Sequence, residues 1–176
     1  MATSTGKPNP SLPYEPVGRW GHISAIVEGR NYMMLGHHGA LTRRPPPTVV
    51  EVFQDEIPNW QQKPTSGQSP PGLVDSACTA IGSNIYVFRN TTIHCLDTKR
   101  LIWRKIQASN PSEAPMAKMG AGMVSLTTNI LVIVGGFQKR PNHRHPDRHY
   151  IPNPKCEGWG WTNELHCFHV DSSELC

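Results

Sequence analysis

The chain has 176 residues, of which 17 are proline, 15 are glycine and 17% are charged, and its formal net charge is +4. This length is enough for one ordinary domain core, and the many prolines and glycines favour a loop-rich all-β protein over a helical one. The basic residues are scattered without interleaved aromatic residues, so nucleic acid is not an expected partner. No apolar run approaches the roughly 20 residues of a membrane span, so a membrane is not expected either.

Residues 1–15 are polar and rich in proline, and we expect them to form a flexible leader. They contain no apolar segment of the kind that a secretory signal needs, so a cytoplasmic or nuclear location, or both, is expected. The five cysteines are widely spaced, odd in number and without a Cys-x-x-Cys pair. In a reducing compartment they are expected to be free thiols.

A first unit of predicted strands opens with the apolar run Ile23–Val27, which leads into a glycine turn. A second predicted strand, Tyr32–Leu35, ends at Gly36, and Val49–Phe53 supplies a third. Trp60 closes this unit. The alternation of short apolar runs with turn residues is typical of antiparallel sheets.

A second unit follows the same order as the first. The predicted buried strand Ile85–Phe88 ends at Arg89, the segment Ile93–Leu96 follows it, and Trp103 closes the unit. A gapless alignment of the two units, made on their glycine turns, places Arg89 opposite Gly36 of the first unit, 53 residues earlier.

A third unit contains the apolar run Ile130–Val134, which is expected to be buried on both faces and which ends at Gly135 and Gly136. The paired glycines predict a bend of the backbone or a neighbour that packs too closely for a Cβ atom. Gly135 lies 46 residues after Arg89, and Leu165–Phe168 closely matches the segment after Arg89.

The order of these features resembles the kelch repeat: an apolar run, Gly-Gly, a variable loop, a short strand ending near Asp97, and Trp103 six residues later. The resemblance implies an all-β, kelch-type β-propeller with about three four-stranded blades. The blades are expected at about 16–65, 73–107 and 116–176, so that residues 16–176 form a partial propeller. In this fold Trp60 and Trp103 would fill wedges between neighbouring sheets. The alternative is three unrelated β-hairpins in another all-β domain.

The third unit carries an insertion at residues 137–161 that ends with two tryptophans, Trp159 and Trp161. Exposed tryptophans are costly in water, so we expect these two to pack on the blade or to line a pocket. The insertion also brings together several candidate zinc ligands, whose spacings match no common pattern: His143, His145, His149 and Cys156. We therefore expect a solvated basic loop and no metal.

No Ser/His/Asp set or pair of carboxylates stands out, so a non-enzymatic protein without a cofactor is expected. The third unit is similar to the kelch-domain-containing substrate receptors of cullin-RING ubiquitin ligases, because Ala117–Gly120, Gly-Gly-aromatic, a long insertion and Trp161 follow in that order. The resemblance implies a module that recognises a substrate protein or peptide, with Trp161 as a pocket wall and ligase subunits as possible partners. The alternative is a general scaffold for cytoskeletal or transcriptional partners.

Arg43 and Arg44 lie in the variable loop of the first unit, between residues 40 and 48. They are candidates for contact with an acidic partner, and the alternative is a pair of solvated loop charges. The third blade is expected to lack its outer strand, because its closing tryptophan would follow Cys176. Since propellers typically have 4–8 blades, further blades or self-association are expected to complete the ring.

Overall fold

The computed structural model describes residues 14–16, 18–37, 49–54, 59–71, 74–106, 117–139 and 150–170. These residues form strands and turns without a helix, so none of them forms a helix that could span a membrane, and the all-β prediction is confirmed. The strands are β1 (Trp20–Val27), β2 (Arg30–His37), β3 (Val49–Gln54), β4 (Asn59–Pro64), β5 (Ser66–Gly67), β6 (Ala77–Ile81), β7 (Asn84–Arg89), β8 (Thr92–Asp97), β9 (Ile102–Ile106), β10 (Lys118–Met119), β11 (Gly122–Ser125), β12 (Ile130–Val134), β13 (Phe137–Lys139), β14 (Ile151–Pro152), β15 (Trp159–Trp161) and β16 (Leu165–His169).

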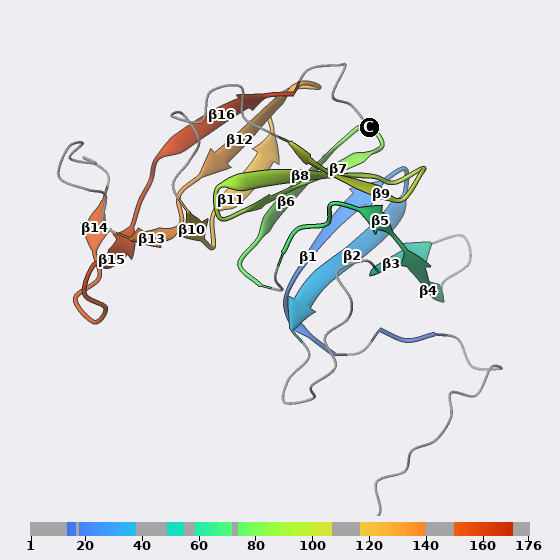
Figure 1. Cartoon of the computed structure of the whole chain (residues 1–176), viewed down its shortest axis with the longest axis horizontal. Helices are drawn as coiled ribbons and strands as arrows, with labels where there is room; N and C mark the ends of the chain where they lie inside the picture. The colour runs from blue at the N-terminus through green and yellow to red at the C-terminus, as the bar shows by residue number, and fades with distance from the viewer. Residues whose placement is uncertain are drawn as a thin grey trace, which may run out of the picture.

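The strands form three main sheets in chain order and one smaller sheet. The first sheet has the order β1-β2-β3-β4, the second β5-β9-β8-β7-β6, and the third β11-β12-β16. The strands β10-β13-β15-β14 form the smaller sheet, which we call the edge sheet. Strand β6 packs against both β1 and β11, so the opening strands of the three main sheets are neighbours, and the second sheet lies between the other two (Figure 1).

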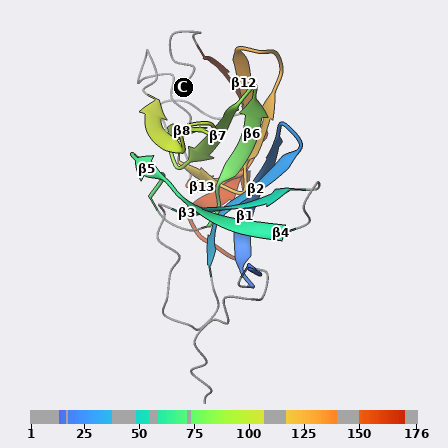
Figure 2. The same cartoon turned by 90° about the vertical axis from the view of Figure 1, so that its right-hand side faces the viewer.

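The second sheet is buried on both faces, as the continuous apolar run in β7 requires. Ile85 and Val87 point into a core shared with the first sheet, whereas Tyr86 and Phe88 point into a core shared with the third. In the view turned by 90°, the strands β6, β7 and β8 of the second sheet lie above β1, β3 and β4 of the first sheet (Figure 2). Each of these apolar side chains stabilises the fold by about 1.5–3 kcal/mol through its burial.

The pairing registers show which residues of the first two sheets are equivalent. Trp60 stands opposite Phe53 in the first sheet, and Trp103 stands opposite Leu96 in the second. Trp103 is 2% exposed in the core between these sheets, and its Nε1 donates a hydrogen bond of 3.1 Å to Thr65 Oγ1. Trp60 is half-buried against Phe53, with 5.3 Å between the ring centroids.

The alignment of the first unit with the other two is wrong by one residue. Strand β1 pairs Trp20 with His37, and β10 pairs Met119 with Phe137, which makes Gly36 the equivalent of Gly136 rather than of Gly135. The backbone agrees, because Gly36 and Gly136 both have positive φ, at 89° and 112°. In the second sheet the equivalent residue is Asn90 (φ 54°), and not Arg89.

The sequence alignment failed here because the hairpin glycines are not equivalent. Gly29 is the second residue of the turn between β1 and β2, whereas Gly82 is the first residue of the turn between β6 and β7. Glu28 takes the first turn position in the first sheet with a φ of 51°, close to the 56° of Gly82. A glutamate in this left-handed conformation gives no signal in the sequence.

The third sheet has three strands among the residues that the structure describes. Residues 137–161, expected as an inserted solvated loop, contribute the strands β13, β14 and β15 of the edge sheet. The edge sheet extends the third sheet beyond a bend, because β13 follows β12 and β15 precedes β16. In Figure 1 the edge sheet lies at the left, beyond the third sheet and away from β3 and β4.

Trp103→Ala is expected to lower the free energy of unfolding by about 3–5 kcal/mol, because it removes a large buried ring between two sheets. Trp60→Ala is the matched control, since Trp60 holds the equivalent place on a face that no other main sheet of the described residues covers. Trp60→Ala is expected to lower the free energy of unfolding by clearly less than Trp103→Ala does. Equilibrium denaturation by urea measures both, and equal losses would contradict the difference in packing.

Candidate interaction surface

The bend between the third sheet and the edge sheet depends on Gly135 and Gly136. Both have positive φ, and a Cβ atom on Gly136 would lie 3.0 Å from the carbonyl oxygen of Met119. The backbone then continues into the edge sheet through two hydrogen bonds of 3.0 Å. Gly135 N–H donates to the carbonyl of Glu164, and Thr162 N–H donates to the carbonyl of Gly136. The glycine pair therefore directs β13 and β15 out of the third sheet together.

One face of the edge sheet collects aromatic side chains from β13 and β15. Phe137 stacks on Trp159 at 5.4 Å between ring centroids, and it also contacts Trp161 at 5.5 Å in a tilted arrangement. Lys139 lies across from Trp159, with its Nζ 5.9 Å from the centroid of the indole ring. Ile151 stands opposite Trp161 on β14. We call these five residues the aromatic surface.

The aromatic surface is accessible to solvent. Trp161 is 47% exposed, Ile151 and Lys139 are exposed, and Phe137 and Trp159 are half-buried. Large exposed apolar residues that gather in one place mark an interaction site more often than a single one does. Tryptophan also contributes to binding hot spots more often than most residues.

Gly160 holds the two tryptophans at this surface. A Cβ atom at position 160 would lie 2.3 Å from the carbonyl oxygen of Ile151 and 2.7 Å from the ring of Tyr150, so only glycine fits. The close approach lets β14 pair with β15 and keeps Ile151 next to Trp161. The alternation of side chains along β15 then places Trp159 and Trp161 on the same face.

A buried lysine ties the edge sheet to the third sheet. The side chain of Lys118 is fully buried, and its Nζ lies 3.3 Å from Oε2 of Glu164. The same oxygen lies 3.2 Å from Nε2 of His166. A buried ammonium group is costly unless it is paired, so the contact with Glu164 fixes the start of β10 against the segment between β15 and β16.

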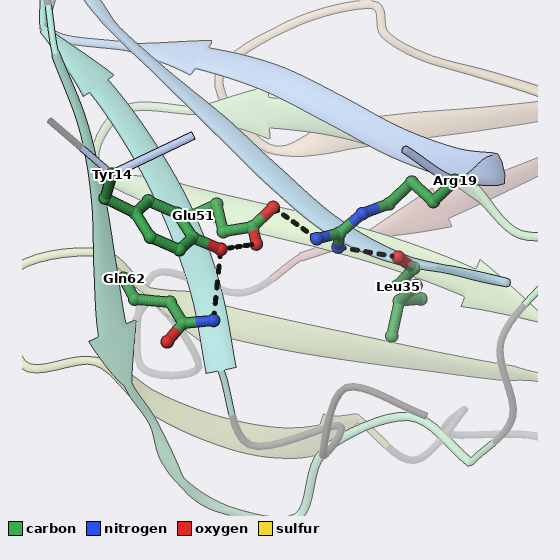
Figure 3. Close-up of polar contacts among 5 residues, drawn as sticks. All are labelled: Tyr14, Arg19, Leu35, Glu51 and Gln62. Atoms are coloured by element: carbon green, nitrogen blue, oxygen red, sulfur yellow. Dashed lines mark hydrogen bonds and ion pairs between the residues drawn. The ribbon is translucent and has the colours of Figure 1, made fainter. Parts of the chain in front are cut away.

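A second buried ion pair lies on the first sheet, on the face directed away from the second sheet (Figure 3). Arg19 Nη2 contacts Glu51 Oε2 at 2.5 Å, and both side chains are under 5% exposed. The second Glu51 oxygen accepts a hydrogen bond from the hydroxyl of Tyr14, which in turn accepts one of 3.1 Å from Gln62. Arg19 also donates to the carbonyl of Leu35, at 3.2 Å. This network attaches the segment before β1 to the sheet.

The structure brings Trp159 and Trp161 together, and it adds Phe137, Lys139 and Ile151, which the sequence analysis did not select. The position of Phe137 directly after the glycine pair, two residues before Lys139, was the available signal. The other predicted contact residues, Arg43 and Arg44, lie outside the described residues, as do the three histidines of the insertion: His143, His145 and His149.

Nothing in the described ranges forms a group of three or more side chains that could hold a metal ion, and Cys156 is an exposed free thiol. Burial raises the pKa of the Cys78 thiol to about 11, and the thiol donates to the carbonyl of Ser24. Burial lowers the pKa of His94, whose ring contacts the carbonyl of Gln68 at 2.9 Å.

A scan against protein-family models gave no match, and no curated protein matches the chain. The aromatic surface and the packing of the sheets are therefore the features that bear on its function. The surface offers apolar rings and one cation.

Above about pH 10, the free energy of unfolding of Tyr14→Phe is expected to fall less steeply with pH than that of the wild type. Burial, together with the hydrogen bond to Glu51, raises the pKa of Tyr14 from 10.0 to about 12. The folded state therefore keeps the phenol proton to higher pH than the unfolded state does, and its contribution to stability is lost as the pH rises from about 10 to about 12. Urea denaturation across this range measures the slope. An unchanged slope in Tyr14→Phe would contradict the assignment.

Proposed function

We propose that this chain is a protein-interaction module built as a partial kelch-type propeller, which binds a peptide segment of a protein partner through the aromatic surface. The repetition of sheets with equivalent residues, such as Trp60 and Trp103, supports the architecture. So does the adjacency of the opening strands β1, β6 and β11, since a propeller places the inner strands of its blades around one axis. The blades correspond to the first, second and third sheets.

The observation that carries the binding role is the exposure of Trp161 beside Phe137 and Trp159 on one face of the edge sheet. Three aromatic rings in contact form a rigid apolar platform that loses little conformational entropy when a ligand covers it. Because the edge sheet lies at one end of the molecule, beyond the third sheet (Figure 1), a peptide reaches the platform without displacing the core.

Lys139 indicates the charge of the ligand. Its ammonium group already occupies the cation position over Trp159, and the described part of the aromatic surface contains no acidic side chain. A peptide with apolar or aromatic residues next to an acidic group would therefore cover the rings and pair with Lys139. Such a charge-assisted contact adds selectivity for acidic over basic peptides.

The resemblance to substrate receptors of cullin-RING ubiquitin ligases extends this proposal to a cellular role. In that role the peptide belongs to a substrate protein, the protein acts in the cytoplasm or nucleus, and the chain works without an enzymatic activity or cofactor of its own. Trp161 and Trp159 are then part of the substrate pocket, and Arg43 and Arg44 remain candidate contacts for an acidic partner. The second candidate role is a scaffold for cytoskeletal or transcriptional proteins.

Trp161→Ala is expected to weaken peptide binding at least tenfold, because the removal of a central aromatic residue costs a hot spot. The probe is the best binder from a displayed library of random peptides, and calorimetry measures its affinity. Trp20→Ala is the matched control, since Trp20 is an exposed tryptophan (59%) on β1 of the first sheet, whereas the aromatic surface lies on the edge sheet. It is expected to leave the affinity unchanged. Equal affinities for wild type and Trp161→Ala would contradict the proposed surface.

Affinity capture from cell extract separates the two cellular roles. A substrate receptor is expected to retain cullin and adaptor subunits on the immobilised chain, with Trp161→Ala keeping these subunits but losing the substrate. A scaffold is expected to retain cytoskeletal or transcriptional proteins instead, and co-sedimentation with filamentous actin tests the first of these. Capture of neither group by a chain that still binds its library peptide would contradict both roles while leaving the peptide-binding proposal intact.

A further inference from the structure

The third sheet presents an apolar face on the side away from the second sheet. We call it the open face of the third sheet. Its exposed residues are Val124 (51% exposed), Val134 (42%) and Leu165 (61%), and the pairing of β12 with β16 places Val132 and Cys167 on the same face. No other main sheet of the described residues covers this face.

Two paired residues of this face, Val132 and Cys167, have equivalents that are buried in the first and second sheets. Val132 stands opposite Cys167, as Tyr86 stands opposite Cys95 and Tyr32 opposite Val52. Tyr32 and Val52 are buried against the second sheet, and Tyr86 and Cys95 are buried against the third. The open face therefore holds the positions that contact the next sheet at both internal interfaces.

The first sheet also presents a face directed away from the second sheet, which carries the Arg19–Glu51 ion pair as well as apolar residues. Ile26 is 72% exposed there, and Phe53 and Trp60 form a half-buried pair beside it. Their equivalents in the second sheet, Leu96 and Trp103, are buried against the first sheet. The open face of the first sheet therefore holds the positions that contact the preceding sheet.

We propose that the open face of the third sheet binds the open face of the first sheet of a second copy of this chain. The contact would repeat the packing that joins the first sheet to the second and the second to the third. Two such contacts, related by a two-fold axis, join two copies head to tail in a closed pair. The open faces of the first and third sheets are then covered in both copies.

The number of sheets agrees with closure. The described residues of each copy supply three main sheets, so those of a pair supply twice three, or six, which lies within the 4–8 sheets of closed propellers. The closure into a ring rests on the propeller architecture proposed above, whereas the contact between the two open faces follows from the repeated packing. A closed pair also carries two copies of the aromatic surface, one on each chain.

Charge substitutions on the two faces test the pairing. Sedimentation equilibrium of the whole chain is expected to give twice the mass of one chain. Leu165→Glu on the third sheet and Ile26→Lys on the first sheet are each expected to give single chains, since either variant places a charge at both contacts. Ile151→Glu is the matched control, because Ile151 is similarly exposed (65%) but lies on the edge sheet, and this variant is expected to remain paired.

An equimolar mixture of Leu165→Glu and Ile26→Lys gives the most specific result. In a head-to-tail pair of the two variants, one contact is unmodified and the other brings Glu against Lys, so the mixture is expected to regain the mass of a pair. A pair through two copies of the same face cannot be regained in this way. Circular dichroism checks that each variant keeps its β structure.

Three outcomes would overturn the proposal. The first is a single, cooperatively melting chain for the wild type at all concentrations. The second is a pair that survives Leu165→Glu and Ile26→Lys, which would mean that another surface joins the copies. The third is growth beyond two copies, which would mean that the contact does not close. Peptide binding by Trp161 stays measurable in every case, so a failure of the pairing is distinguishable from a failure of the proposed function.

Discussion

The burial of the second sheet on both faces is the constraint on which the rest of the structure depends. Strand β7 has apolar side chains on each face, with Ile85 and Val87 on one and Tyr86 and Phe88 on the other. A sheet of this kind is stable only between two further sheets, because either face would otherwise meet water. The first and third sheets supply that cover, but each has a second face of its own. The same rule of packing that explains the core therefore also explains the two open faces.

The first sheet and the edge sheet share one arrangement of a glycine and a buried ion pair. It lies where β1 pairs with β2 and where β10 pairs with β13. Arg19 and Lys118 are buried basic residues at equivalent positions, and their side chains pass over Gly36 and Gly136. A Cβ atom on either glycine would lie within 3.0–3.3 Å of the basic side chain. Arg19 pairs with Glu51 of β3, and Lys118 pairs with Glu164, which directly precedes β16. The left-handed glycine and the buried ion pair thus form one unit, which in the edge sheet also directs β13 and β15 toward the aromatic surface.

Apolar periodicity predicted the main strands, because an apolar run such as Ile130–Val134 leaves a direct mark on the sequence. The expectation that this strand is buried on both faces was wrong, because its outer face carries Val134, which is 42% exposed. Trp159 and Trp161 were identifiable as candidates since exposed tryptophan is costly. The ion pair between Arg19 and Glu51 was not predictable, because it joins the residue before β1 to a residue of β3, 32 positions further along the chain. The edge sheet was missed for a similar reason. Its strands have two or three residues, and β14 includes a proline, so turn signals outweigh strand signals there.

We propose that the aromatic surface binds a peptide while the core between the sheets stays unchanged. The chain has five tryptophans, so a two-dimensional NMR spectrum of the indole N–H groups reports on both regions at once. Addition of a library-selected peptide is expected to shift the indole signals of Trp159 and Trp161 and to leave that of the buried Trp103 in place. Shifts confined to Trp20 or Trp60, with Trp159 and Trp161 unaffected, would contradict the account.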